Sequence, residues 1–177
     1  MIHTNPEIEL VINQSGEMAK KFNHRYVTLE HLFLSMIRFA PFREILVKFG
    51  ADVEGIDRDL EIYLQKQIFQ VGNLTDSDGE ESHPKKTHAL ERVFNRAQVQ
   101  VMFTGRKAMT TIDLYLALMA EFNSHSHYFL LKYGVKKLEF AEFWQKNYAH
   151  SEAQKLSPDQ AGEVLSEHCT NLTKLAK

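Results

Sequence analysis

Cysteine is nearly absent from this sequence, which holds one, Cys169, among 177 residues. A single thiol cannot form an internal disulfide, so the core must stabilise the fold. Glycine and proline are also scarce, with 8 and 4 residues, and they lie between apolar stretches rather than inside them. This scarcity argues against a turn-rich β protein and favours an all-α fold with long helices.

An excess of charge of one sign is also missing. The formal net charge is −2, which leaves no basic excess for binding a polyanion, so we expect no nucleic-acid partner. No apolar run approaches the ~20 residues that span a bilayer. The first residues, MIHTNPEIEL, lack the basic and apolar regions of a secretion signal. We therefore expect no membrane partner and a cytoplasmic location.

Apolar residues recur at helical spacing through the first third of the chain. Thr4 is a candidate N-cap for the first helix, with Pro6 in the first turn and Glu7 closing a capping box. Thr28 opens the second helix and Gly50 ends the third. The helices after the first are expected at about 28–39, 41–49 and 53–64.

The same pattern then begins again further along the chain. Phe49-Gly50 corresponds to Tyr133-Gly134, and Thr28 corresponds to Thr110. Four short helices cannot cover their own apolar face, so two copies are expected to pack about a pseudo-twofold axis. The sequence predicts two tandem four-helix repeats, 5–65 and 87–147, which form one domain over 1–148. A polar mobile loop at 70–86 joins them.

The last part of the chain, 149–177, is polar and is interpreted as a flexible tail or linker. Ser157-Pro158-Asp159-Gln160 could cap one more amphipathic helix. This segment is either a peripheral helix or the start of a further domain.

No motif for catalysis or metal binding stands out. The phosphate-binding pattern GxxxxGK[ST] does not occur, and neither do HExxH or paired CxxC motifs. His168 and Cys169 are neighbours in sequence, so on a helix they would point apart. His125 and His127 lie in a polar connection, where exposure to solvent is expected. We predict no catalytic residue, no metal and no cofactor for this chain, and hence that it is not itself an enzyme.

Three aromatic residues have an unusual position in the sequence. Phe39 and Phe42 flank Pro41 at a helix junction, and Phe69 precedes the polar loop. Residues at turns are usually exposed, so these rings are candidates for an apolar surface patch. Local capping contacts explain them equally well.

Taken together, the motifs resemble the amino-terminal domain of Clp ATPases, most closely of the ClpA type. Tyr26 to Leu34, YVTLEHLFL, is similar to the family pattern T-x-E-H-L-L-L. In the second half, Thr87 to Ala97 and Thr104-Gly105-Arg106 resemble the family, and the likeness covers residues 5 to about 147. Cys169 to Lys177 resembles the segment that leads into the first ATPase module, which suggests that a larger protein continues from here.

The resemblance implies a non-catalytic module that binds adaptors and substrates. Such a domain sits on a hexameric unfoldase, which uses ATP and Mg²⁺ in the full-length protein, and binds a ClpS-type adaptor. It helps to pass protein substrates to the ClpP peptidase. The residues that match the family's binding positions are Arg25, Thr87, Leu90, Arg92 and Arg96. The isolated domain is expected to be a monomer.

Two positions depart from the family pattern. Arg25 stands where the ClpA pattern has an acidic residue that faces the adaptor. Relatives that read phosphoarginine carry Thr-Glu-His in both halves, whereas here Glu30 is kept and Ile112 occupies the second position. A phosphoarginine receptor is therefore not expected. The alternative to an unfoldase module is a stand-alone decoy or regulator that occupies an adaptor without any ATPase.

Overall fold

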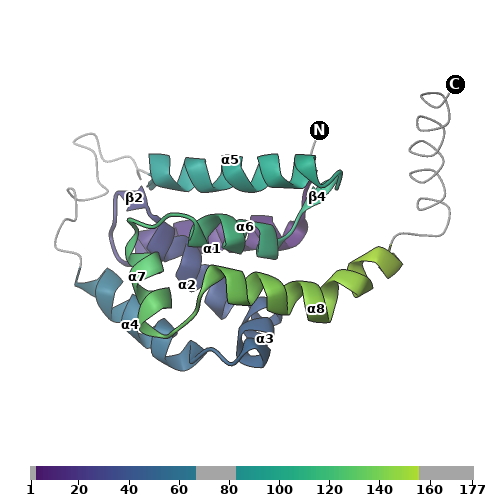
Figure 1. The fold of residues 1–177 in the computed structure, drawn as a ribbon. Coiled ribbons are helices and arrows are strands. Elements are labelled where there is room, and N and C mark those ends of the chain that lie inside the picture. Colours follow the sequence, from purple (N-terminus) through teal and green to yellow (C-terminus); the bar gives the residue numbers. More distant parts are fainter. Residues whose placement is uncertain (1–2, 67–82, 156–177) are drawn as a thin grey trace, which may run out of the picture. The chain divides into compact units, whose positions relative to one another are not determined.

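A computed structural model of the chain describes residues 3–66 and 83–155 (Figure 1). These residues form eight helices and four two-residue strands, which confirms the expected all-helical fold with two repeats and adds short strands that the sequence analysis missed. Most of the expected loop 70–86 lies outside the described residues, as do Phe69, Cys169 and most of the expected tail.

The elements of the first repeat are β1 (His3–Thr4), α1 (Pro6–Lys21), β2 (Tyr26–Val27), α2 (Leu29–Arg38), α3 (Ala40–Phe49) and α4 (Val53–Gln65). Those of the second are β3 (Lys85–Lys86), α5 (His88–Phe103), β4 (Ala108–Met109), α6 (Thr111–Met119), α7 (His125–Lys132) and α8 (Lys137–Lys155). Corresponding elements as far as the third helix start 82 to 85 residues apart, so the duplication expected from the sequence is present in the structure.

The start of α1 differs from the expectation by one residue. Asn5, not Thr4, is the N-cap, and its side-chain oxygen accepts a hydrogen bond from the amide of Glu7 at 3.2 Å. Thr4 belongs to β1, where it pairs with Met109, so its extended backbone is already used by the strand. Thr28 caps α2 as expected, and Gly50 ends α3 with a positive φ of 96°.

The short strands connect the two repeats by exchange. β1, which precedes α1, pairs in parallel with β4, which lies between α5 and α6. In the same way β3, which precedes α5, pairs in parallel with β2, which lies between α1 and α2. Each repeat thus supplies the strand partner that the other lacks. This reciprocity is the clearest expression of the pseudo-twofold relation between the repeats.

Equivalent aromatic residues meet where the repeats pack together. Phe33 on α2 and Tyr115 on α6 hold corresponding positions, and their rings stack with centroids 6.1 Å apart. Phe42 of α3 packs edge-on against Tyr115 at 4.9 Å and is only 1% exposed. The idea that Phe42 is part of a surface patch is therefore wrong, because Phe42 lies in the first turn of α3 and Tyr115 of the second repeat packs against it.

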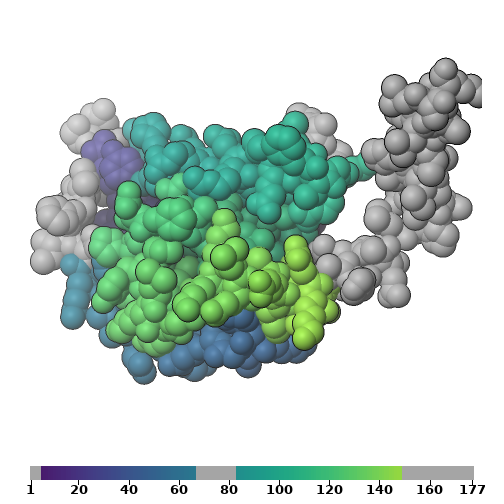
Figure 2. Space-filling view, viewed as in Figure 1, coloured from purple at the N-terminus to yellow at the C-terminus, as the bar shows by residue number. Residues whose placement is uncertain are grey.

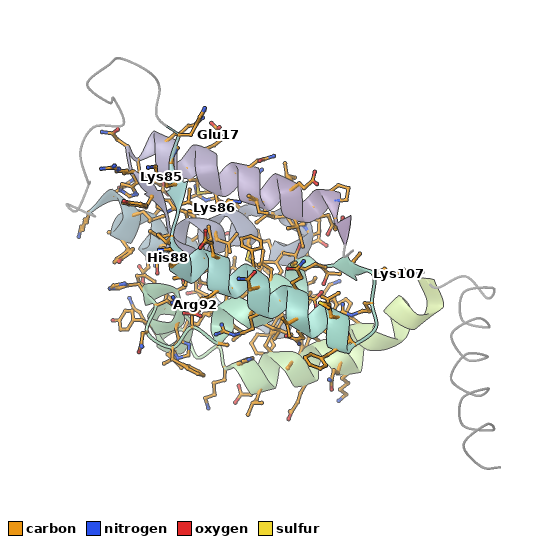
Figure 3. All side chains as sticks on the ribbon, turned by 90° about the horizontal axis from the view of Figure 1, so that it is seen from above. Glu17, Lys85, Lys86, His88, Arg92 and Lys107 are labelled. Carbon is orange, nitrogen blue, oxygen red and sulfur yellow. The ribbon has the colours of Figure 1, made fainter. Side chains whose placement is uncertain are left out.

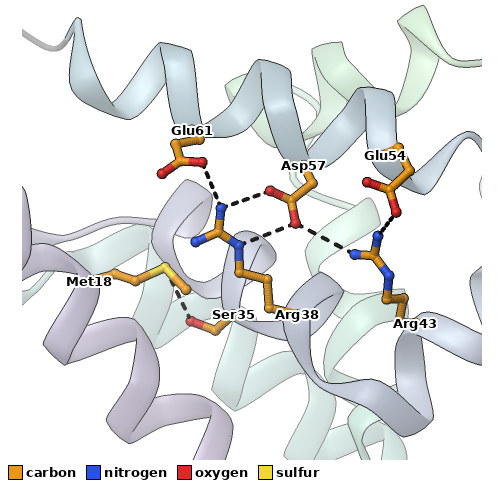
Figure 4. Close-up of polar contacts among 7 residues, drawn as sticks. All are labelled: Met18, Ser35, Arg38, Arg43, Glu54, Asp57 and Glu61. Carbon is orange, nitrogen blue, oxygen red and sulfur yellow. Dashed lines mark hydrogen bonds and ion pairs between the residues drawn. The ribbon is translucent and has the colours of Figure 1, made fainter.

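A charged network holds the helices of the first repeat together on the outside (Figure 4). Arg38, at the end of α2, contacts Asp57 at 2.8 Å and Glu61 at 2.9 Å on α4. Arg43 on α3 pairs with Glu54 and approaches Asp57 at 3.6 Å. Because two arginines share one carboxylate, α2, α3 and α4 are fixed relative to one another.

The chain divides into two compact units, residues 1–137 and 138–177. Helices α1 to α7 belong to the first unit, and nearly all of α8 belongs to the second. Within the first unit, α5 forms one edge of the face seen in Figure 2, where its residues are teal. The predicted domain boundary at residue 148 stays a prediction. Among the described residues, no helix is long and apolar enough to cross a membrane.

Alanine substitution at two helical glycines is expected to change the free energy of unfolding in opposite directions. A Cβ on Gly55 in α4 would lie 2.6 Å from the ring of Tyr133 and 2.5 Å from the carboxylate of Asp52, which caps the helix. We expect Gly55→Ala to destabilise the protein by about 1–3 kcal/mol through this overpacking, despite the better helix propensity of alanine. Urea unfolding followed by circular dichroism measures the change.

Gly16 in α1 is the matched control, because a Cβ added to it would have no neighbour within 4 Å. Gly16→Ala should stabilise the protein by roughly 0.5–1 kcal/mol, the usual gain in a helix interior. A Gly55→Ala protein as stable as the Gly16→Ala protein would show that the space beside Tyr133 is larger than the structure indicates.

Candidate functional site

The pairing of β2 with β3 brings the two repeats together at the start of α5. The amide of Lys85 donates to the carbonyl of Arg25 at 2.9 Å, and the amide of Thr87 donates to the carbonyl of Val27 at 3.2 Å. Arg25 and Thr87 are 62 residues apart in sequence, and the pairing of β2 with β3 brings them to the same end of the domain. Both were predicted as binding residues, and the structure brings them together.

These residues border a hollow of about 190 Å³, which we call the junction hollow. It lies where the loop after α1, the start of α2, the end of α4 and the start of α5 meet. Its lining residues are His24, Arg25, Tyr26, Thr28, Glu30, His31, Tyr63, Leu64 and Thr87. Sequence analysis predicted Arg25 and Thr87 as binding residues here, and missed the others because they come from helix ends that only the fold brings together.

Thr87 is the N-cap of α5. Its hydroxyl accepts a hydrogen bond from the amide of Leu90 at 3.3 Å and donates one to the carbonyl of Val27 at 3.2 Å. Leu90 is only 1% exposed, so its side chain packs in the core and supports the helix start rather than facing a partner. Of these two predicted binding residues, Thr87 alone lines the junction hollow.

Arg92 and Arg96 lie one and two turns further along α5. Both contact the carboxylate of Glu121, at 3.1 and 3.0 Å, and Arg96 also donates to the carbonyl of Ala117 at 3.1 Å. Burial of Glu121 opposes its ionisation, but hydrogen bonds from the two arginines hold its pKa below the ordinary value. The arginines thus tie α5 to the end of α6 while their outer faces stay exposed.

A basic rim begins at Arg25, which lines the junction hollow, and continues through β3 along the first turns of α5. It consists of Arg25, Lys85, Lys86, His88 and Arg92, all of which are exposed. Figure 3 shows Lys85, Lys86, His88 and Arg92 together at one end of α5, with Lys107 at the other end. Within residues 5–66 and 83–148, no ion pair involves Arg25, Lys85 or Lys86. This rim is a local concentration of positive charge on a chain with a net charge of −2.

Glu30 supplies the hollow with a buried carboxylate. Its Oε1 accepts a hydrogen bond from the amide of Ser126, in the first turn of α7, at 3.2 Å. A carboxylate at a helix start is stabilised by the free amides there. Burial, and next the charge of Glu30, raise the pKa of Tyr63 to about 12, so this phenol stays protonated. Its hydroxyl and Nδ1 of His125 share a hydrogen bond of 2.8 Å.

Two buried histidines line the hollow. Nδ1 of His24 and Nε2 of His31 are 2.8 Å apart, and the two side chains are 7% and 0% exposed. Burial, and next the charge of His24, lower the pKa of His31 to about 3, and burial also lowers the pKa of His24. Sequence analysis missed this pair, although Arg106 and Asp113 hold the equivalent positions and could have pointed to it.

No group suited to metal binding is present in the described part of the chain, where no three His, Cys, Asp or Glu side chains come together. The two histidines of the hollow bond to each other rather than to a shared point. The hollow presents charged and hydrogen-bonding side chains, among them Arg25, Glu30 and Thr87.

Comparison with known proteins decides the family. The model of the Clp repeat (R) N-terminal domain family matches residues 4–133, which include the β2–β3 pair and the junction hollow. The chain belongs to this family. The resemblance stated from the motifs is thereby confirmed.

Individual relatives agree with this assignment. A ClpA homolog protein of Fuscovulum blasticum is 26% identical over 187 residues, which cover 96% of this chain and 23% of that protein. The chain therefore spans about a quarter of the length of this relative. The N-terminal domain of the ClpD chaperone from Arabidopsis thaliana superposes with a TM-score of 0.60 at 17% identity, covering 81% of this chain and 93% of that one.

The N-domain of ClpV from Vibrio cholerae has the same fold. Its TM-score is 0.60 at 15% identity, and the match covers 81% of this chain and 83% of the ClpV chain. At this level of identity the likeness concerns the fold alone.

The cap at Thr87 can be tested on the isolated chain. We expect Thr87→Ala to lower the free energy of unfolding by about 1–2 kcal/mol, because the amide of Leu90 loses its acceptor and the link to Val27 is broken. Thr87→Ser keeps the hydroxyl and should stay within about 0.5 kcal/mol of the wild type. Urea unfolding measures both. Equal losses in the two variants would mean that the methyl group, not the cap, matters.

Proposed function

We propose that this chain is the adaptor- and substrate-binding module of a Clp-type ATP-dependent protein unfoldase that feeds a ClpP-type peptidase. The observation that carries the proposal is the meeting of Arg25 and Thr87 at one exposed hollow in a chain of the Clp repeat family. The same residues match the family's binding positions. The module would contribute recognition, and the ATP-dependent work would belong to other parts of the unfoldase.

The charge of the site specifies the kind of partner surface that fits it. Arg25 and the lysines of β3 have no acidic partner among the described residues, so an acidic partner could form new ion pairs without breaking old ones. Arg92 is already paired with Glu121, but more than half of its side chain is exposed. We therefore propose that the adaptor presents carboxylates to the basic rim.

The role of Thr87 in this docking follows from its place at the start of α5. A partner that covers the hollow would lie against the first turn of the helix, where the threonine is already capping. Aspartate also caps helices well, so Thr87→Asp adds a negative charge at this point without removing the cap. Aspartate cannot donate to the carbonyl of Val27 as the threonine does, so the free energy of unfolding is measured beside binding, and Thr87→Ala, which loses the same hydrogen bond without gaining a charge, is the matched control.

Calorimetric titration of the chain with a ClpS-type adaptor tests the proposal. We expect saturable binding that weakens several-fold when the salt concentration is raised from about 50 to 200 mM, because exposed ion pairs are screened. Thr87→Asp should weaken binding at least ~10-fold, and Arg25→Glu should weaken it several-fold by placing like charges opposite each other.

Lys48→Glu is the matched control, because it makes the same change of charge as Arg25→Glu at an exposed position on α3, away from β2 and α5 (Figure 1). It should bind like the wild type. Absence of binding at any concentration contradicts the adaptor proposal. Tighter binding by Arg25→Glu would instead show that the adaptor is basic where it meets Arg25.

A further inference from the structure

Equivalent positions of the two repeats hold two chemically different pairs. His24 and His31 in the first repeat correspond to Arg106 and Asp113 in the second, each 82 residues further on. In both repeats the first residue follows the turn after a long helix, and the second lies in the first turn of the next helix. The fold therefore uses each pair for the same task, which is to fix the start of α2 or of α6.

In the second repeat the task is done by an ion pair. Nη1 of Arg106 donates to Oδ2 of Asp113 at 3.1 Å, and a second bond joins Nη2 to Oδ1. The same Oδ2 accepts the amide of Thr110 at 2.8 Å and so caps α6. A guanidinium is always charged, and carboxylates generally ionise well below the range in which imidazoles titrate.

In the first repeat the task is done by neutral imidazoles. The amide of Thr28 donates to Nδ1 of His31 at 3.0 Å, so this nitrogen carries no proton. The proton of His31 is then on Nε2, which donates to Nδ1 of His24 at 2.8 Å. The proton of His24 must in turn be on its own Nε2. The protons on the ring nitrogens of the chain from Thr28 to His24 are thus assigned, and the hydroxyl of Thr28, 3.0 Å from the same Nδ1 of His31, can donate to it as well.

One more proton cannot be added without breaking this chain. A proton on Nδ1 of His31 removes the acceptor for the amide of Thr28. A proton on Nδ1 of His24 makes two N–H groups face each other over 2.8 Å. Both imidazoles are buried, so a ring that loses its partner must shift before it can reach a new one.

We propose that the His24–His31 pair is an acid-sensitive cap, which holds the start of α2 and one wall of the junction hollow only while both imidazoles are neutral. Acidification releases the amide of Thr28 and loosens this wall, whereas the Arg106–Asp113 pair keeps α6 capped. The inference concerns the fold itself and holds whichever partner the hollow binds.

The surroundings of the pair on balance disfavour a further proton, because burial outweighs the hydrogen bond to the backbone of Leu64, which raises the pKa of His24. The other charged or titratable residues that line the hollow are Arg25, Glu30 and Tyr63, and Tyr63 shares a hydrogen bond with His125. On the side of α1, the ring of Phe22 contacts His24, and Lys21 lies over that ring. Arg25, which lines the same hollow, is a cation and offers no acceptor to a protonated imidazole. Among the described residues that line the hollow, Glu30 alone is a carboxylate, and it accepts a hydrogen bond from the amide of Ser126.

The direction of the pH dependence follows from the lowered pKa values. The ordinary pKa of histidine is 6.5, and in the folded protein the pKa of His31 is about 3 and that of His24 is also lowered. Below about pH 6.5 the unfolded chain therefore binds more protons than the folded one. The stabilisation is complete above that pH and is lost progressively as the pH falls towards the pKa of the folded state.

Urea unfolding between pH 7.5 and 5.0 tests the proposal on the full chain. The wild type is compared with His24→Arg/His31→Asp, which copies the second-repeat pair into the first. Below pH 6.5 we expect the unfolding constant to rise more steeply with falling pH in the wild type than in the double variant. The difference is up to about tenfold per pH unit for each histidine that stays neutral in the folded protein. The reverse exchange, Arg106→His/Asp113→His, should make the dependence steeper than in the wild type.

Nitrogen NMR of the wild-type imidazoles gives a second readout that does not depend on any variant folding. Both rings should carry their proton on Nε2 and remain neutral at pH 6, and the amide of Thr28 should keep the shift of a hydrogen-bonded donor. Equal pH slopes in the wild type and the His24→Arg/His31→Asp protein overturn the proposal. A protonated ring at pH 6 with an unchanged Thr28 amide overturns it as well.

Discussion

The exchange of strands between the repeats is the constraint on which the rest of the structure depends. A two-residue strand has no stability alone, and its backbone groups need a partner. Here β1 finds its partner in β4 and β2 finds its partner in β3, so neither repeat completes its own hydrogen bonds. The same exchange forces the apolar faces of α2 and α6 together, with Phe33 stacked on Tyr115. The duplicated unit is stable as a pair rather than as two separate halves.

Where strands are exchanged, residues far apart in sequence must meet, and this creates the junction hollow. The pairing of β2 and β3 fixes Arg25 beside the start of α5, and the packing of α2 places Glu30 at the start of α7. Helix starts carry free amides and attract negative charge. The hollow is therefore a recognition surface built from helix ends, and its basic rim extends that character outward along α5.

The two repeats share a backbone plan but differ in chemistry at this junction. Glu30 corresponds to the buried Ile112, and the imidazole pair corresponds to an ion pair. Symmetry fixes the positions, since the left-handed turns at Asn23 and Gly105 also correspond. The side chains at those positions are free to diverge once the backbone is secured. Divergence of this kind turns a symmetric scaffold into one with distinct surfaces.

The sequence by itself determined the helical class, the duplication, most helix boundaries and the family. These follow from local signals, such as the spacing of apolar residues, the cap at Thr28 and the glycine at position 50. Only the tertiary structure decided the strand exchange, the burial of Phe42 and of Leu90, and the contact between His24 and His31. A two-residue strand has no periodicity to detect, and the burial of a turn residue depends on what the other repeat places over it.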